Sequence, residues 1–334
     1  RNRHGDYVGG PMYYIKNGLG KNWRFLAVLY SAFGVLTVFG TGNATQVNTI
    51  TTAIDTALIN FNVISESSTG RLNLILGIVI TLLVGMVLLG GIKRIGSVSE
   101  KLVPFMALFY IVLALGVVIL NIGRVPAVFH DIVYGAFNPS AVTGGVIGSF
   151  FLSMKKGVSR GIFSNEAGLG TGSIAHACAD TRKPVKQGMF GIFEVFADTI
   201  VVCSMTGLVV ITTGYWNSGL QGSELTLTAF ESGMGSVARA LIALSIFLFG
   251  LTTSTGWFTY YSVILKHWLK GNQKVLKVAE KVFIFGTPLW GLLVTVLTLY
   301  GNGTPAQLWV IADFTTIFPT FVNVATLFLL SGTF

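Results

Sequence analysis

Charged residues are scarce in this sequence and make up 10% of its 334 residues, whereas an ordinary soluble domain carries about 25%. Hydrophobic residues make up 52%, and the mean hydropathy is +0.72. A soluble protein with buried helices would need helices with one charged face, but runs such as 72–89 and 102–120 are apolar all round. Runs of about 20 apolar residues can cross a bilayer. The composition therefore predicts an all-α, polytopic transmembrane helix bundle.

Cysteine and histidine are also rare. The two cysteines, Cys178 and Cys203, lie within or beside apolar segments, and the four histidines lack metal-ligand spacing. Nucleophile motifs, phosphate-binding loops and dinucleotide fingerprints are missing too, so the sequence predicts neither an enzyme nor a bound cofactor. The net charge of +9 lies in short connections rather than on one face with interleaved aromatics, which disfavours nucleic acid as a partner.

Apolar runs between Gly, Pro and charged breaks divide the chain into eight predicted membrane segments. These segments cover residues 24–58, 71–92, 102–121, 142–179, 188–214, 235–269, 276–300 and 306–333. We expect them to form one transmembrane domain over 1–334. The first segment would be about 52 Å long at about 1.5 Å per residue, against a hydrocarbon core of about 30 Å, so we expect it to tilt strongly or to protrude.

Lys and Arg collect in alternate connections, at 1–24, 93–101, 182–186 and 266–281. The positive-inside rule places these connections in the cytoplasm, which predicts a multi-pass protein of the plasma (inner) membrane with both ends of the chain inside. The sequence opens without an initiator methionine and closes directly after an apolar run, so we expect both ends to be cut from a longer protein.

The fourth segment has an unusual middle, GIFSNEAGLGTGSIAHA at 161–177, in which glycines flank Ser164, Asn165 and Glu166. Irregular backbone at membrane depth is tolerated only where it lines a cavity or is buried in protein, so we expect a broken helix at a ligand site. The break would free carbonyls for cations and aim a helix N-terminus at a carboxylate. A glycine-lined close crossing of helices is the alternative explanation.

Three basic residues, Lys155, Lys156 and Arg160, lie within the same segment, where a charge facing lipid costs about 2.5–3.5 kcal/mol. We expect them to face a wet vestibule or a partner, and Glu166 is the nearest acidic candidate in the sequence. Alternatively, 142–156 is an external interfacial helix whose basic end is solvated.

The first segment carries the polar stretch GTGNATQVNTITT at 40–52. Asn43 and Gln46 stand three residues apart, so both amides can point into one cavity and suit a zwitterion. Hydrogen bonds between helices would explain these amides equally well.

The stretch GLTTSTGWFTYY at 250–261 places two adjacent hydroxyls, Thr252 and Thr253, at membrane depth. Neutral hard oxygens suit a small cation such as sodium, although threonines in membranes often bond back to their own helix. Trp257, four residues after Thr253, would face the same cavity.

Two carboxylates remain in the predicted segments. Asp198 is an intramembrane group and therefore a functional candidate for a proton or cation path, although a structural hydrogen-bonding role is slightly favoured. Asp313 lies near the end of a segment, and we expect it to be interfacial.

Several stretches resemble the alanine/glycine:cation symporter family. They are GGPMYYI at 9–15, GTGNATQVN at 40–48, GIKRIG at 91–96, VPFMALFY at 103–110, RGIFSNEAGLG at 160–170, DTIVVCSMTGL at 198–208, TTSTGW at 252–257 and WVIAD at 309–313. The resemblance covers nearly the whole chain in family order. It implies a leucine-transporter-type, inverted-repeat fold in which the eight segments are core helices three to ten and the first two core helices are absent.

The resemblance also implies roles for individual residues. Gln46, Phe163 and Trp257 would contact the substrate, and Asn165 would sit at the helix break. Thr252 and Thr253 would bind sodium together with carbonyls of the missing first helix. The sequence departs from the family pattern at Val47, at 171–173 and at Pro319, which stands four residues before Asn323 instead of next to it.

These features together predict a secondary active symporter that couples inward sodium flow to the uptake of alanine or glycine by alternating access. Sodium would be a co-transported ligand rather than a cofactor. The alternatives are the same fold coupled to protons or moving another small solute, an ion channel, and a non-transporting scaffold or sensor.

Overall fold

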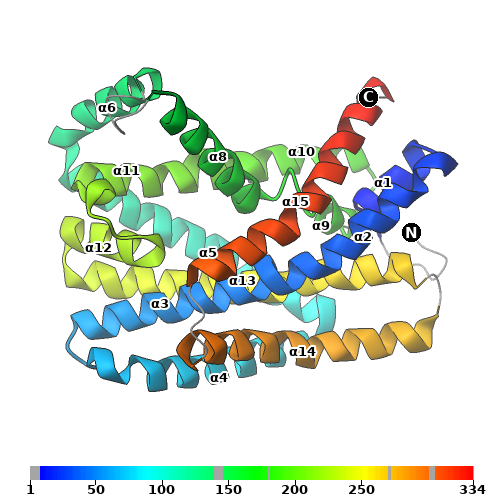
Figure 1. Cartoon of the computed structure of the whole chain (residues 1–334), viewed down its shortest axis with the longest axis horizontal. Helices are drawn as coiled ribbons and strands as arrows, with labels where there is room; N and C mark the ends of the chain where they lie inside the picture. The colour runs from blue at the N-terminus through cyan, green and yellow to red at the C-terminus, as the bar shows by residue number, and fades with distance from the viewer. Residues whose placement is uncertain (1–7, 139–145, 180, 270–271, 301–304, 334) are drawn as a thin grey trace.

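The computed structural model describes residues 8–138, 146–179, 181–269, 272–300 and 305–333, and within these ranges it contains helices and turns but no strand. Seven described helices are long and apolar enough to cross a membrane. They are Lys21–Asn60, Glu66–Leu88, Arg94–Leu120, Pro184–Thr213, Ser236–Trp268, Gln273–Thr298 and Gln307–Leu330. The predicted class, a polytopic transmembrane helix bundle, is therefore confirmed, and seven of the eight predicted segments contain such a helix (Figure 1).

The first segment is one helix of 40 residues, Lys21–Asn60, built from four stretches. The 3-10 turn η1 (Lys21–Trp23) leads into α2 (Arg24–Phe39), the π-helical turn η2 (Gly40–Ala44) and α3 (Thr45–Asn60), while the short helix α1 (Pro11–Gly18) precedes them. The polar stretch at 40–52 thus begins with a π turn in the middle of the span. Such π turns are rare in proteins, and those that occur often lie at functional sites.

The fourth predicted segment, 142–179, is broken in the structure. Its residues 142–145 lie outside the described ranges, and the rest forms α8 (Val146–Asn165) and α9 (Gly172–Ala177), separated by the non-helical residues 166–171. Because α8 runs without interruption through 156, the basic residues Lys155 and Lys156 lie inside a helix rather than at the end of one.

The remaining elements follow in chain order. They are η3 (Glu66–Ser68), α4 (Thr69–Leu88), α5 (Gly91–Leu120), η4 (Ile122–Arg124), α6 (Val125–Phe137), α10 (Pro184–Val195), the π stretch η5 (Phe196–Cys203), α11 (Ser204–Thr213), η6 (Tyr215–Asn217), α12 (Gly222–Met234), α13 (Ser236–Trp268), α14 (Gln273–Tyr300), α15 (Pro305–Leu330) and η7 (Ser331–Thr333).

The helix α13 lies at the centre of the bundle and packs against α2, α3, α5 and α12 (Figure 1). The core around it contains the buried side chains of Val47, Trp257, Phe258 and Phe283. On the outside of the bundle, large apolar side chains such as Leu82 and Phe105 are exposed, which suits contact with lipid rather than water.

The connections α9–α10 and α13–α14 lie toward the same end of the bundle as α1 and the last turns of α15 (Figure 1). Both of these connections are basic, and they belong to the set that the charge pattern places together. Three members of that set, Arg1, Arg3 and Lys270, lie outside the described residues. The structure thus agrees with the alternation of the basic connections, while the side on which the cytoplasm lies stays a prediction.

Candidate functional site

The break after α8 has the backbone of a left-handed helix cap. Glu166 follows the last helical residue with φ +55°, and Gly170 has φ +82°. The Glu166 N–H still donates to the Ile162 carbonyl at 3.1 Å, and the Gly170 N–H donates to the Glu166 carbonyl at 2.9 Å. A left-handed residue after the last turn is a common helix terminator, but glycine usually fills it, so a glutamate in that conformation is an unusual choice. The predicted broken helix is confirmed.

Two other helices hold the carbonyls of the break. From α15, the Asn323 side-chain amide donates to the Gly168 carbonyl at 2.8 Å and to the Ala167 carbonyl at 3.4 Å. From α2, the Tyr30 hydroxyl donates to the Leu169 carbonyl at 3.0 Å. At these three positions each carbonyl accepts one hydrogen bond from a side chain and keeps a second lone pair, so the expectation of carbonyls available to cations stays a prediction.

Asn323 is a functional candidate that sequence analysis noted only as a departure from the family pattern. It is fully buried, and its Oδ1 atom accepts a hydrogen bond from the Tyr14 hydroxyl of α1. Asn323 therefore links α1, α15 and the break. Sequence analysis could have singled out Asn323 as an amide in the middle of an apolar segment. Polar side chains at membrane depth are costly unless they have partners, so such an amide indicates a specific contact.

Glu166 does not pair with the basic residues of α8. Its carboxylate accepts a hydrogen bond from the Thr171 hydroxyl, and the Tyr260 hydroxyl of α13 is a second hydrogen-bonding neighbour. Glu166 was only the nearest acidic candidate in sequence for these basic residues, and it has other partners because the turn at 166 directs its side chain toward Thr171 and α13. Tyr260 stands one turn after Trp257, so the break reaches the part of α13 that carries the predicted site.

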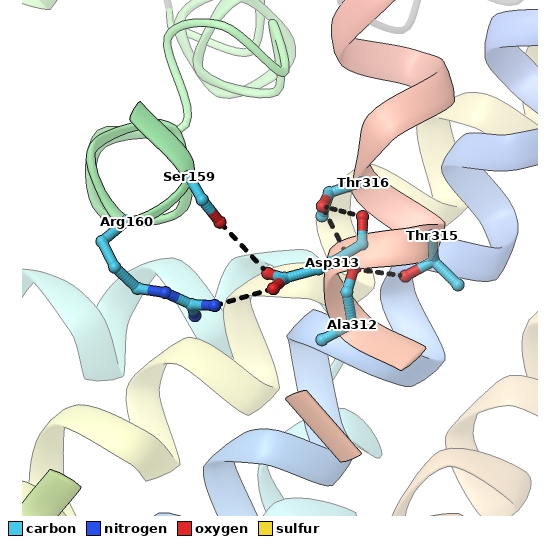
Figure 2. A network of polar contacts seen from close by, with 6 residues as sticks. All are labelled: Ser159, Arg160, Ala312, Asp313, Thr315 and Thr316. Atoms are coloured by element: carbon cyan, nitrogen blue, oxygen red, sulfur yellow. Dashed lines mark hydrogen bonds and ion pairs between the residues drawn. The ribbon is translucent and has the colours of Figure 1, made fainter. Parts of the chain in front are cut away.

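Arg160 pairs instead with Asp313 of α15, with its Nη2 atom 2.7 Å from Oδ2, and Ser159 reaches the same carboxylate at 3.5 Å (Figure 2). The guanidinium also lies 4.8 Å from the centre of the Trp309 ring. Asp313 is thus an ion-pairing residue inside α15 rather than a merely interfacial one. Lys155 and Lys156 are exposed on α8.

Phe163 belongs to the same contact between α8 and α15. Its ring lies 5.1 Å from the ring of Trp309, and the Arg160 guanidinium lies 5.7 Å from its centre. Phe163 is therefore grouped with Trp309, Arg160 and Asp313, while the residue three positions on, Glu166, contacts α13.

The end of α8 contacts the π stretch η5. Asn165 donates to the Thr199 hydroxyl at 3.0 Å and accepts from the Ala167 N–H at 2.9 Å. The Ser164 hydroxyl donates to the Asp198 carboxylate. These contacts fit the structural role that the sequence left open for Asp198, and they place Asn165 at the break as expected.

The π turn η2 faces two different helices. On one side a Cβ atom on Gly42 would lie 2.6 Å from Cγ of Trp257, so the indole of α13 packs directly on this glycine. On the other side the Asn43 Oδ1 atom lies 2.5 Å from the position of a Cβ on Gly291 of α14. The Gln46 amide donates to the Thr41 carbonyl at 3.2 Å. The structure thus directs Asn43 to α14 instead of placing its amide beside that of Gln46.

Asn43 is fully buried, and neither its Nδ2 nor its Oδ1 atom has a hydrogen-bond partner among the described residues. The Thr41 hydroxyl of the same turn is also unsatisfied there. A buried amide without partners costs about 1–3 kcal/mol, so a π turn that carries two unsatisfied polar side chains is a candidate for contact with a polar ligand.

The hydroxyl of Thr252 donates to the carbonyls of Leu248 and Phe249, at 3.0 and 2.9 Å. This is the bonding to the preceding turn that the sequence left open as an alternative, although the hydroxyl oxygen keeps lone pairs that can face a cation. Thr253 is half-buried on the next face of α13.

A cavity of about 810 Å³ opens between the break, α10 and α15. Its lining includes Asn165, Gly170, Asn323 and Tyr14, together with His176, whose Nε2 atom lies 2.9 Å from the Glu194 carboxylate. Gln46, Phe163 and Trp257 do not line it. The structure therefore joins the break to a cavity, but it brings the predicted residues together as three neighbouring groups rather than around one pocket.

The sequence model of the sodium:alanine symporter family matches residues 1–334. The chain belongs to the sodium:alanine symporter family. The predicted family is thereby confirmed, as is the prediction of a membrane transporter rather than an enzyme or a protein that depends on a cofactor.

Several curated relatives align with almost the whole of this chain. An "Uncharacterized transporter" of Haemophilus influenzae is 40% identical, with 98% of this chain and 67% of the relative aligned. The "Sodium/alanine symporter AgcS" of Methanococcus maripaludis is 34% identical, over 98% of this chain and 68% of the relative. The "Probable sodium/glutamine symporter GlnT" of Bacillus subtilis is 34% identical, over 97% and 63%. The chain thus spans about two thirds of the length of the curated relatives it matches.

Proposed function

We propose that the chain is the larger part of a secondary active symporter that couples inward sodium flow to uptake of a small neutral amino acid, alanine or glycine. The observation that carries this proposal is the meeting of a π turn and a broken helix on α13. Trp257 packs on Gly42 of the π turn, and Tyr260, one turn later, neighbours Glu166 of the break. Discontinuous membrane helices are the usual setting for substrate and ion sites in transporters, and π turns are frequent at functional sites.

In this proposal the amino acid lies between the π turn, the break and α13. Gln46 faces the ammonium group, while the rings of Trp257 and Phe163 bound the side chain. Asn43 and Thr41 contribute polar groups that lack protein partners. The unequal directions of Asn43 and Gln46 in the structure mean that substrate binding would turn at least one of these amides toward the ligand.

Sodium would lie at Thr252 and Thr253, completed by backbone carbonyls of a helix that precedes this chain in a leucine-transporter-type fold. Carbonyls 167–169 each already accept a hydrogen bond from a side chain, so only their second lone pairs would be free for a cation. One sodium ion with a zwitterion moves one net charge, so about 100 mV contributes roughly 2.3 kcal/mol, enough for roughly a 50-fold concentration ratio. Binding on one side and rocking of the bundle would complete the cycle.

Two variants of this function remain as alternatives. The relative named a probable sodium/glutamine symporter supports a larger neutral amino acid in the same site. Proton coupling through Asp198 is the other, although its contact with Ser164 favours a structural role. An ion channel would show neither saturation nor counterflow.

The proposal is tested with the full-length protein in proteoliposomes. Radiolabelled alanine uptake is measured with an inward sodium gradient and with choline at the same membrane potential, in competition with glycine and glutamine. The proposal is supported if alanine uptake is saturable, depends on sodium and is inhibited more strongly by glycine than by glutamine. Uptake that is unchanged in choline would show that transport is not coupled to sodium. Stronger competition by glutamine than by glycine would show that the site prefers the larger amino acid.

A further inference from the structure

A carboxylate that the proposed symport site does not use lies near the end of α3. Asp55 is 9% exposed, and its Oδ1 atom is buried without a hydrogen-bond partner among the described residues. It stands nine residues after Gln46, about 13 Å along the helix at about 1.5 Å per residue, and it is therefore separate from the proposed substrate contacts.

Asn73, near the start of α4, is a side-chain neighbour of the Asp55 carboxylate and is placed to donate to it. The amide nitrogen must be the donor, because an ionised carboxylate only accepts. The Asn73 Oδ1 atom is then left over, and it too is buried without a partner in the described part of the chain. The pair thus contains two unsatisfied buried oxygens, a deficit that a bound cation would remove.

Asn73 also lines a polar cavity of about 170 Å³ between α3, α4 and α14. The lining consists of Asn48, Thr51, Thr52, Asn73, Val294, Thr295 and Thr298. The α3 members are spaced so that they share one helix face with Asp55. The hydroxyls of Thr295 and Thr298 donate to carbonyls of their own helix, at 3.0 and 3.1 Å, so their oxygens keep lone pairs for an ion.

The charge of Asp55 has no ion-pair partner among the described residues. The nearby guanidinium of Arg239 donates to the Thr56 carbonyl at 3.3 Å, but it is paired with Glu231 at 2.6 Å. Arg71, two residues before Asn73, is exposed. A buried carboxylate in a membrane helix is costly unless a cation or a proton neutralises it.

We propose that this pocket between α3, α4 and α14 is a second sodium site, with Asp55 as its anionic group. Asp55 is not among the lining residues and adjoins the pocket through its neighbour Asn73, so the ion would lie at the Asn73 end of the pocket. Asn73 and Asn48 amide oxygens and the threonine hydroxyls would supply the neutral oxygens that a small hard cation accepts. The cavity also has room for several waters, since one water occupies about 30 Å³. A proton on Asp55 would also satisfy the pair, because the carboxyl O–H could then donate to the Asn73 oxygen, so the test below compares sodium binding with pH dependence.

The ligand set favours a monovalent ion. Calcium sites in proteins use several carboxylates, whereas this pocket has one. No group of three His, Cys, Asp or Glu side chains that could hold a metal ion occurs among the residues that the structure describes. The choice of sodium over potassium rests on the proposed function, and the site itself rests on the geometry of Asp55 and its neighbours.

The test is binding of radiolabelled sodium to the purified full-length protein in detergent, without amino acid. The variants are Asp55→Asn, Thr298→Val and Thr253→Val, with Asp131→Asn as the matched control because that carboxylate is exposed on α6. Melting temperatures identify any variant that fails to fold. We expect Asp55→Asn to remove one bound sodium per chain or to weaken its binding by about tenfold or more, and Thr298→Val to weaken it by about threefold or more.

The outcomes separate this site from the proposed coupling site at Thr252 and Thr253. If Asp55→Asn loses a bound sodium and Thr253→Val does not, the result supports the new site and contradicts a sodium site at Thr252 and Thr253. Sodium binding by folded Asp55→Asn that equals the wild type overturns the inference, as does an effect confined to the pH dependence of uptake. If Asp55→Asn does not fold, unchanged binding in Thr298→Val overturns it.

Discussion

The side-chain amide of Asn323 donates to the carbonyl of Gly168 at 2.8 Å and so fastens α15 to the break between α8 and α9. The two residues are 155 positions apart in the sequence. A Cβ on Gly170 would lie 2.7 Å from the same amide group, so the close approach of the break to α15 depends on this glycine as well.

Replacing Asn323 should therefore disturb the break directly. Asn323→Ala leaves the Gly168 carbonyl unsatisfied, at a cost of about 1–3 kcal/mol of unfolding free energy. Asn323→Asp keeps an acceptor for Tyr14 but removes the N–H donor, so we expect it to be as damaging. Thermal unfolding and alanine uptake check this, with Asn217→Ala, at an exposed position, as the control. Wild-type stability and uptake in Asn323→Asp would show that the contact is dispensable.

Gly42→Ala tests the contact between the π turn and Trp257. The added Cβ would lie 2.6 Å from the indole, so we expect the ring to shift, with a loss of about 1–3 kcal/mol in stability and weaker amino-acid binding. Gly207→Ala is the matched control, because a Cβ there has open space. The two variants are compared by melting temperature and by KM for uptake. Equal KM values for Gly42→Ala and Gly207→Ala would show that Trp257 does not contact the substrate.

Thr253→Val tests the proposed sodium ligand without a large change in volume. We expect the sodium concentration for half-maximal uptake to rise by about tenfold, while uptake at saturating sodium is largely kept. Thr253→Ser retains the hydroxyl and should behave like the wild type. If valine and serine variants have the same sodium dependence, the hydroxyl is not a ligand.

The sequence could predict the class of fold and the position of the broken helix. Eight segments are predicted, and the seven that contain a membrane-length helix follow from run lengths, while the break near 165 follows from glycines beside polar residues. Both are local signals. The partners of the polar residues could not be predicted, because packing between distant segments selects them. Arg160 pairs with Asp313, which is 153 residues away in the sequence, although Glu166 is much nearer in sequence. Asn43 and Gln46 share a helix face by spacing, but the π turn gives them different neighbours.

The Arg160–Asp313 pair should matter through its position between α8 and α15 (Figure 2). Both side chains are partly exposed, so we expect Arg160→Gln or Asp313→Asn to lower stability by only about 1 kcal/mol, while transport falls more strongly. The exchange Arg160→Asp with Asp313→Arg should recover part of the loss. Lys155→Gln, at an exposed position on the same helix, is the control. No recovery in the exchanged protein would argue against a role for the pair.

The most direct test of the account measures alanine binding to the purified full-length protein by titration calorimetry, in sodium and in choline, for the wild type and for Gln46→Ala. The account predicts that sodium strengthens alanine binding and that Gln46→Ala weakens it by about tenfold or more without a comparable loss of melting temperature. Equal alanine affinity in sodium and choline, or an unchanged affinity in Gln46→Ala, would contradict a joint sodium and amino-acid site at the π turn, the break and α13.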